Sequence, residues 1–295
     1  MKDFLYLIKR NIKVYFNDKG LFFTSLITPA ILLVLYATFL AGIFEDSFIS
    51  SIPEKLNISN SIIKALVSGQ LMSSLLAVSC ITVAFSSNML MVQDKINGTI
   101  KDLNVSPIKK SKIVLAYFVS CFISTIIVNL VALILCLIYT YFRGWYYSFS
   151  DVMYLLLDVL LLTIFGCSLS SVVNSNLKSQ GQVSAVSAII SSAYGFLCGA
   201  YMPISSFGKG LQKVLSFLPG TYGTSLIRNH SMNPIFNQIE NINSSVINNI
   251  KKGVDCSIEF NGNIVSILNM YLVLIISIIF LLFLYLIINK MKKSK

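Results

Sequence analysis

The residue types that could catalyse a reaction are few in this sequence and lie far apart. There is one histidine, His230, in a region we expect to be exposed, and the long apolar stretches contain one ionisable residue, Asp158. Proteases and acyltransferases need a histidine close to a serine or glutamate, or two neighbouring aspartates. The six cysteines show no metal-binding spacing. We therefore expect no catalytic centre and no metal site in this chain.

The chain is apolar enough to lie in a membrane. Of its 295 residues, 55% are hydrophobic and 12% are charged, whereas soluble domains carry about 25% charged residues. Stretches of about 18 apolar residues can cross a bilayer as helices. Six stretches qualify, at about 21–43, 66–93, 113–142, 152–175, 180–203 and 263–289. We predict an all-α, polytopic membrane protein that forms a single domain over residues 1–295.

The segments between the spans predict the orientation. Apolar residues recur every three to four positions among basic ones in residues 1–19, which predicts an amphipathic helix in the membrane interface. Lysine and arginine number 15 on the side of both termini and 8 on the other side, so both termini are predicted to be cytoplasmic. The net charge of +11 then faces anionic membrane lipids and requires no nucleic acid.

The segment at residues 204–262 is predicted to lie on the outer side. Prolines and glycines interrupt its first half, and asparagines dominate the rest, so it is too polar to span the bilayer. We expect a re-entrant, amphipathic first part and a surface-exposed second part. The preceding span, 180–203, is rich in serine, alanine and glycine, which allow close helix contacts. Burial within its own bundle and contact with another subunit explain that composition equally well.

Polar residues inside the spans are candidates for a substrate pathway, namely Asn129, Asp158 and Tyr194. A charge within a span is costly, and such a residue is by default functional or paired. Alternatively, Asp158 follows Asp151 by two helical turns and reaches the outer surface, a reading that this short spacing favours.

The stretch Asp94–Lys112, DKINGTIKDLNVSPIKKSK, brings five lysines between two charge-free spans. Ile96, Ile100 and Leu103 share one helical side, Gly98 loosens the start, and Ser106-Pro107 ends the segment. The pattern predicts a short amphipathic helix on the cytoplasmic side. It fits a helix that docks on a partner protein and a positively charged interfacial loop equally well.

Two motifs carry a resemblance to a known family. The first motif consists of an acidic residue, then Gly-Thr, then a leucine and finally Ser-Pro, at fixed spacing. The matching residues are Asp94, Gly98, Thr99, Leu103, Ser106 and Pro107. The second follows the fifth span at Pro203, Ser205, Leu211, Gln212, Pro219, Tyr222 and Arg228. With these two motifs and six predicted spans, the sequence resembles the ABC type-2 permeases. These proteins are the membrane subunits of ATP-driven exporters. The sequence departs from them at Lys101, where the family has glutamate.

The resemblance implies a division of work between subunits. Residues 94–112 would form the coupling loop that docks on an ATP-binding subunit, with Asp94, Gly98, Thr99, Ile100, Leu103 and Pro107 carrying the coupling. Pro203, Pro219 and Tyr222 would belong to an outer gate. The sequence lacks Gly-x-x-x-x-Gly-Lys-Ser/Thr, so ATP and magnesium are expected on the partner and no cofactor on this chain. A second permease copy or a paralogue would complete the transporter.

The resemblance also suggests a substrate. The segments GAYMPISSFGKGLQ and LPGTYGTSLIRNH look most like permeases of multidrug or haemolysin-type export. We therefore expect outward movement of a drug-like, peptide or amphipathic toxin substrate across a bacterial plasma membrane. A polysaccharide or lipid exporter of the same family is the alternative, as is an immunity or scaffold protein that transports nothing.

Overall fold

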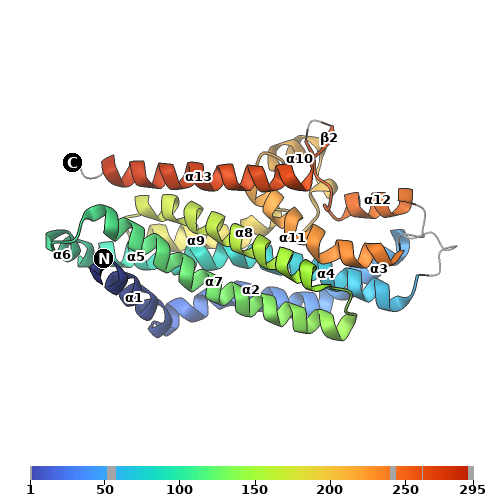
Figure 1. Ribbon diagram of the computed structural model, residues 1–295, viewed down its shortest axis with the longest axis horizontal. Coiled ribbons are helices and arrows are strands. Elements are labelled where there is room, and N and C mark those ends of the chain that lie inside the picture. The colour runs from blue at the N-terminus through green and yellow to red at the C-terminus, as the bar shows by residue number, and fades with distance from the viewer. Residues whose placement is uncertain (1, 52–57, 240–243, 261, 292–295) are drawn as a thin grey trace.

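The computed structural model describes residues 2–51, 58–239, 244–260 and 262–291. Long helices lie side by side in an elongated bundle, with α1 (Lys2–Asn17) and the last turn of α13 (Ile267–Met291) at the same end (Figure 1). The other long helices are α4 (Asn60–Ser87), α7 (Lys110–Arg143) and α8 (Phe149–Asn176). A continuous first helix is built from α2 (Lys19–Leu35), a π-helical turn (Tyr36–Leu40) and α3 (Ala41–Ser51).

Five helical segments of the described chain are long and apolar enough to cross a membrane, at Lys19–Asp46, Asn60–Ile96, Lys110–Arg143, Phe149–Asn176 and Ile267–Met291. They correspond to the first four predicted spans and the sixth. The fifth predicted span contains α9 (Gln180–Leu197), a helix outside that set. The all-α membrane fold is thus confirmed, whereas six spans and cytoplasmic termini stay predictions. The segment between the first two predicted spans, residues 44–65, lies partly outside the described residues.

The predicted interfacial helix at residues 1–19 is α1, and it ends where a capping residue starts the next helix. The Asp18 side chain accepts a hydrogen bond from the backbone N–H of Leu21, at 3.1 Å, and so caps α2. On the buried side of α1, the Tyr15 hydroxyl donates to Ser25 Oγ at 2.8 Å. These contacts fix the bend between α1 and the first membrane-spanning helix.

The α4 helix forms the centre of the bundle and is almost entirely buried by α2, α7, α8, α9 and α11. Glycines bring two neighbours to backbone contact with it. A Cβ atom on Gly69 would lie 2.7 Å from the carbonyl oxygen of Ser231 in α11, and one on Gly166 of α8 would lie 2.7 Å from that of Cys80. In a membrane, such close approach supplies packing energy that the hydrophobic effect does not.

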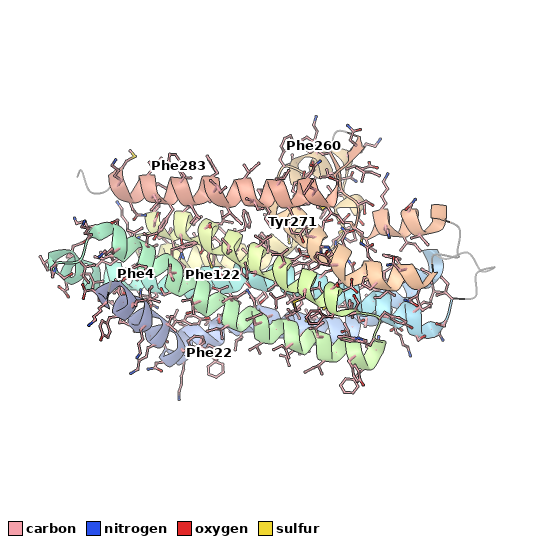
Figure 2. All side chains as sticks on the ribbon, in the orientation of Figure 1. Phe4, Phe22, Phe122, Phe260, Tyr271 and Phe283 are labelled. Carbon is pink, nitrogen blue, oxygen red and sulfur yellow. The ribbon has the colours of Figure 1, made fainter. Side chains whose placement is uncertain are left out.

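By contrast, α13 packs mainly on α8 and α11 and exposes most of its apolar surface. Phe283 projects away from the bundle, while Tyr271 lies near α11 (Figure 2). The exposed apolar side chains identify this surface as one that faces lipid.

The segment after α9 forms short elements and then a buried helix. The short elements are η2 (Ile204–Ser206), α10 (Lys209–Leu215), η3 (Asn237–Ile239), α12 (Ser244–Gly253) and an antiparallel hairpin of β1 (Glu259–Phe260) and β2 (Asn263–Ile264). Between them, α11 (Pro219–Phe236) returns into the bundle against α4, α8 and α13. Residues 229–236 are therefore mostly buried, and the expectation of a surface segment from Asn229 onward is wrong for this part.

Candidate functional site

The predicted coupling helix is α6 (Thr99–Val105), which lies between α5 (Met89–Ile96) and α7. Gly98 adopts a left-handed conformation, with φ of +83°, and turns the chain out of α5. Thr99 follows and is half-buried. At the other end, Ser106 leaves the helical conformation and its hydroxyl donates to the Leu103 carbonyl at 2.6 Å. The helix thus begins after the predicted glycine and ends before the exposed Pro107.

The apolar residues of α6 face in two directions. Ile100 and Leu103 are partly buried against a core cluster that includes Leu7 and Ile8 of α1. Val105 is 87% exposed. Four other exposed residues surround it: Lys101, Asp102, Asn104 and Pro107. Ile100 and Leu103 therefore attach the helix to the bundle, and the surface open to a partner is formed by Val105 and its polar neighbours.

Asp94 lies inside the protein rather than on that surface. Its carboxylate accepts a hydrogen bond from the Tyr117 hydroxyl of α7 at 2.5 Å and forms a two-pronged ion pair with Arg10 of α1. The hydrogen bond from Arg10 to Asp94 raises the pKa of the guanidinium above its ordinary value. Asp94 thus joins α1, α5 and α7 shortly before α6 in the chain.

Asp158 is buried and paired, so the expectation that it reaches the outer surface is wrong. Its side chain is 1% exposed. It contacts His230 Nδ1 of α11 at 2.6 Å and accepts a hydrogen bond from the Tyr271 hydroxyl of α13 at 2.5 Å. The His230 ring stacks on Tyr154, with ring centroids 5.0 Å apart. His230 is likewise largely buried rather than exposed, and these residues join α8, α11 and α13.

The other two candidates for a substrate pathway lie elsewhere in the core. Asn129 is fully buried, accepts a hydrogen bond from Ser79 at 2.8 Å and donates one to Thr163 at 3.0 Å. Tyr194 of α9 is buried, and its hydroxyl would lie 2.4 Å from a Cβ atom at Gly220. Asn129, Asp158 and Tyr194 contact different partners, and none of the three lines the hollows beside the first membrane-spanning helix.

The predicted gate residues lie at two turns of the segment after α9. Pro203 precedes η2. Pro219 starts α11, and in the same turn the buried Tyr222 donates from its hydroxyl to the carbonyl of Ser216 at 2.6 Å. Burial raises the pKa of Tyr222 above its ordinary value. Pro219 and Tyr222 are therefore close neighbours, whereas Pro203 belongs to the preceding turn.

Arg228 is the residue that sequence reasoning missed as a structural centre. Its guanidinium is completely buried and donates to Ser73, Ser74 and the carbonyls of Gly199 and Val254 at 2.9–3.2 Å. Asp255 Oδ2 lies 3.6 Å from it. The sequence shows Arg228 only as the last residue of the motif after the fifth predicted span. Nothing in that motif indicates that the arginine side chain is buried.

Asp255 holds the other side of this cluster. Its carboxylate accepts hydrogen bonds from the backbone N–H groups of Ile204 and Ser205, at 2.5 and 3.2 Å, which places η2 directly after Pro203. Burial raises the pKa of Asp255, and Arg228 and the two N–H groups oppose that shift. The neighbouring Cys256 is a buried thiol whose pKa is raised to about 12 by burial, so it is a poor nucleophile.

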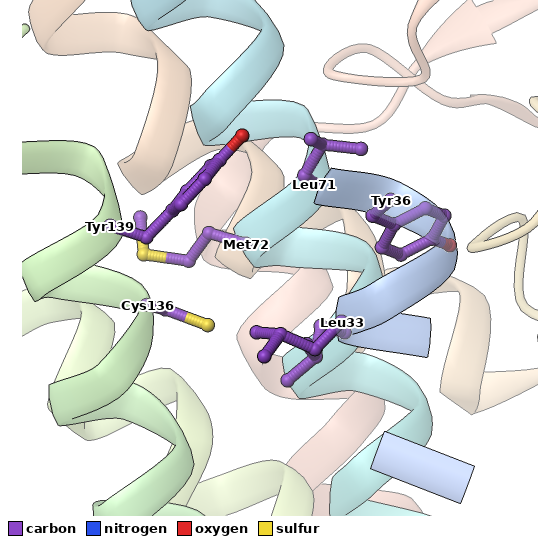
Figure 3. Close-up of a pocket in the computed structure, with 7 residues that line it drawn as sticks. Leu33, Tyr36, Leu71, Met72, Cys136 and Tyr139 are labelled. Carbon is purple, nitrogen blue, oxygen red and sulfur yellow. The ribbon is translucent and has the colours of Figure 1, made fainter. Parts of the chain in front are cut away.

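Two hollows adjoin the first membrane-spanning helix. A void of about 20 Å³ lies among Leu33, Tyr36, Leu71, Met72, Leu75, Cys136 and Tyr139 (Figure 3), room for a water molecule at most. Tyr36 also borders a groove of about 610 Å³ between α2 and α9, with Ser192 and Phe196 on its opposite wall. Only the groove has the size of a site for a drug-sized molecule.

Within the described parts of the chain, no group of histidine, cysteine, aspartate and glutamate side chains could hold a metal ion. The model of the family described as ABC-2 type transporter matches residues 2–230. No curated protein matches the chain. The matched range includes α1, the buried Asp94, the helix α6 and the buried Arg228. The chain therefore belongs to the ABC-2 type transporter family.

Proposed function

We propose that this ABC transporter permease works in an exporter of a bacterial plasma membrane, where it moves a drug-like, peptide or amphipathic toxin substrate outward. A separate ATP-binding subunit supplies the energy, with ATP and magnesium bound there. A second permease, identical or paralogous, completes the pathway. Both termini and α6 lie on the cytoplasmic side, in keeping with the excess of lysine and arginine at that end.

The observation that carries this proposal is the two-sided construction of α6. Its outer side presents Val105 among polar residues, while Ile100 and Leu103 pack on a core cluster formed by residues of α1, α5, α7 and α13. A partner that pushes the outer side therefore pushes on a cluster to which α1 and α7 both contribute. Asp94 adds a directional connection, because its ion pair with Arg10 and its hydrogen bond with Tyr117 join the same two helices.

The groove between α2 and α9 supports the second permease and the class of substrate. The face of α9 beside this groove carries exposed residues with small side chains, namely Ser184, Ala185, Ala188 and Ser192. Their exposure favours a subunit contact over burial within one bundle. A second copy against this face would enclose the groove. Its apolar wall of Ile31, Leu35 and Phe196 suits an amphipathic substrate better than a sugar chain.

The experiment compares two matched valines. The tagged full-length chain is purified in detergent with the ATP-binding subunit encoded beside it, as wild type, Val105→Asp and Val214→Asp. Val214 is also exposed in a seven-residue helix, α10, at the other end of the bundle. We expect Val105→Asp to reduce the co-purified ATPase about tenfold, and Val214→Asp to leave it unchanged.

Each other result has a definite meaning. If Val105→Asp retains the ATPase as well as wild type does, the outer side of α6 is not the docking surface. If no form of the chain retains an ATPase, a scaffold or immunity protein without transport becomes the better description. Ile100 and Leu103 are unsuitable positions for this test because their replacement by aspartate would disturb the core.

A further inference from the structure

A second groove, of about 720 Å³, lies between the start of α7 and the end of α13. It is at the end of the bundle that carries α1 and α6 (Figure 1). Lys109 and Lys110 border it from α7, and Lys290 borders it from α13. Ile108, Val114 and Leu286 form its apolar wall. The hollow therefore combines cationic groups with an apolar surface.

The inner end of this groove is held by a direct contact between the two helices. Tyr285 of α13 is 1% exposed, and its hydroxyl donates to the Val114 carbonyl of α7 at 3.1 Å. Within α13, one turn further, the side-chain amide of Asn289 donates to the Tyr285 carbonyl at 2.8 Å. Because the helices are joined at this point, lysines from both of them are kept beside the same hollow.

The charge of the groove is not balanced by the ion pairs of the described residues, none of which includes Lys109, Lys110 or Lys290. All three lysines are exposed. A cluster of lysines at the end of membrane helices attracts an anionic headgroup. Its flexible ammonium groups adapt to a phosphate without requiring a rigid geometry.

The surface of α13 extends this groove along the membrane. An unbroken helical stripe of exposed residues leads to Lys290: Ile276, Ile279, Phe280, Phe283, Leu286 and Ile287. A lipid acyl chain can lie along this stripe while its headgroup meets the lysines. An acidic protein surface would use the lysines and leave the apolar stripe unmatched, so the combined features favour a lipid.

We propose that the groove between α7 and α13 binds an anionic phospholipid, with its phosphate at Lys109, Lys110 and Lys290 and an acyl chain along α13. The groove begins at Ile108, next to Pro107 of the α6 surface, and it is separate from the α2–α9 groove. It does not depend on the direction of transport or on the transported substrate.

The test uses native mass spectrometry of the detergent-purified full-length chain, titrated with phosphatidylglycerol and with phosphatidylcholine of the same acyl chains. We expect wild type to bind the first lipid about tenfold more tightly. The triple variant Lys109→Gln, Lys110→Gln, Lys290→Gln should lose this preference. A variant with arginine at the same three positions should keep it. The control variant Lys209→Gln, Lys213→Gln, Lys251→Gln removes the same charge elsewhere and should bind as wild type does.

Several outcomes would overturn the proposal. Equal binding of both lipids by wild type would do so, as would an unchanged preference in the triple glutamine variant. Displacement of phosphatidylglycerol by millimolar inorganic phosphate would assign the lysines to a free ion. Loss of the co-purified ATPase in the triple variant, without any lipid preference in wild type, would assign the groove to an acidic surface of the partner subunit.

Discussion

Asp158 is stabilised by contacts that the local sequence does not contain. Seen along α8 alone, it is a charge two turns from Asp151, and the sequence reading placed it at the surface. In the structure, His230 and Tyr271 come from two later helices and cover it. The sequence predicts a re-entrant first part of residues 204–262, but not a helix in it that packs on α8 and α13, so neither partner could be predicted. A lone ionisable residue in a span does predict that a partner exists, and that part of the reasoning is correct.

Replacing Asp158 by alanine should lower the free energy of unfolding by about 2–4 kcal/mol, because the polar groups of His230 and Tyr271 would lose their buried acceptor. Asp151→Ala on the same helix is the control. It removes an exposed capping contact with Ser148 and should cost about 1 kcal/mol or less. Denaturant titration in detergent measures both variants, and equal losses would contradict the buried pairing.

Asp94 carries the corresponding prediction at the opposite end of the bundle. Arg10→Gln leaves the buried carboxylate with Tyr117 alone and should lower the free energy of unfolding by about 1–2 kcal/mol, reduced by the partial exposure of Arg10 to solvent. Lys9→Gln, at the exposed neighbouring position, should change it by less than about 0.5 kcal/mol. Thermal unfolding in detergent compares the two, and the same stability in both would exclude the ion pair as an anchor of α1.

At the scale of elements, α6 shows what sequence can and cannot predict. Its ends follow from Gly98 and Ser106-Pro107, which act on the backbone locally, and the structure agrees. Its inward side depends on where α1 lies, and that information is absent from residues 94–112. The amphipathic pattern of Ile100 and Leu103 was therefore correct as a helix signal, but these residues pack on the protein itself.

Gly98→Ala tests the turn that starts α6. No atom lies within 4 Å of the Cβ position, so the cost arises from the left-handed backbone alone, at about 1–2 kcal/mol. Gly210→Ala is the control, because Gly210 lies in a helix and also has no atom near its Cβ position. This change should raise the free energy of unfolding by up to about 1 kcal/mol. Unfolding of both variants in urea provides the comparison. A Gly98→Ala chain as stable as wild type would show that this turn is not held at positive φ.

At the scale of the whole molecule, the helices differ in how much of their surface other helices bury. The central helix α4 is enclosed, while α2, α7, α9 and α13 each leave a face open. The open faces of α13 and α9 differ, because α13 exposes mainly large apolar residues suited to lipid, whereas α9 exposes several small residues together with Ile189, Phe196 and Leu197. Composition predicted a bundle of membrane helices correctly, but it did not reveal which helix is central. That arrangement depends on contacts such as Gly69 with Ser231, between segments far apart in the chain.

Disulfide crosslinking in native membranes distinguishes these two faces. A Ser192→Cys chain treated with copper phenanthroline should form a covalent dimer if two copies meet at α9. Ile276→Cys, exposed on α13, should remain monomeric. The six native cysteines are all buried, so wild type provides the background. Crosslinking at Ile276 rather than Ser192 would move the subunit contact to α13 and contradict the assignment of α9.

The buried Arg228 imposes an order on biogenesis. A ribosome makes Ser73 155 residues before Arg228, while Val254 and Asp255 follow later still. Until residue 255 has left the ribosome, the guanidinium has no carboxylate beside it, and η2 lacks the acceptor for its backbone N–H groups. The hydrogen bonds that join α11 and η2 to residues 254–255 can therefore form only late in synthesis. During that interval, the first helices can already be inserted while Arg228 still lacks Val254 and Asp255.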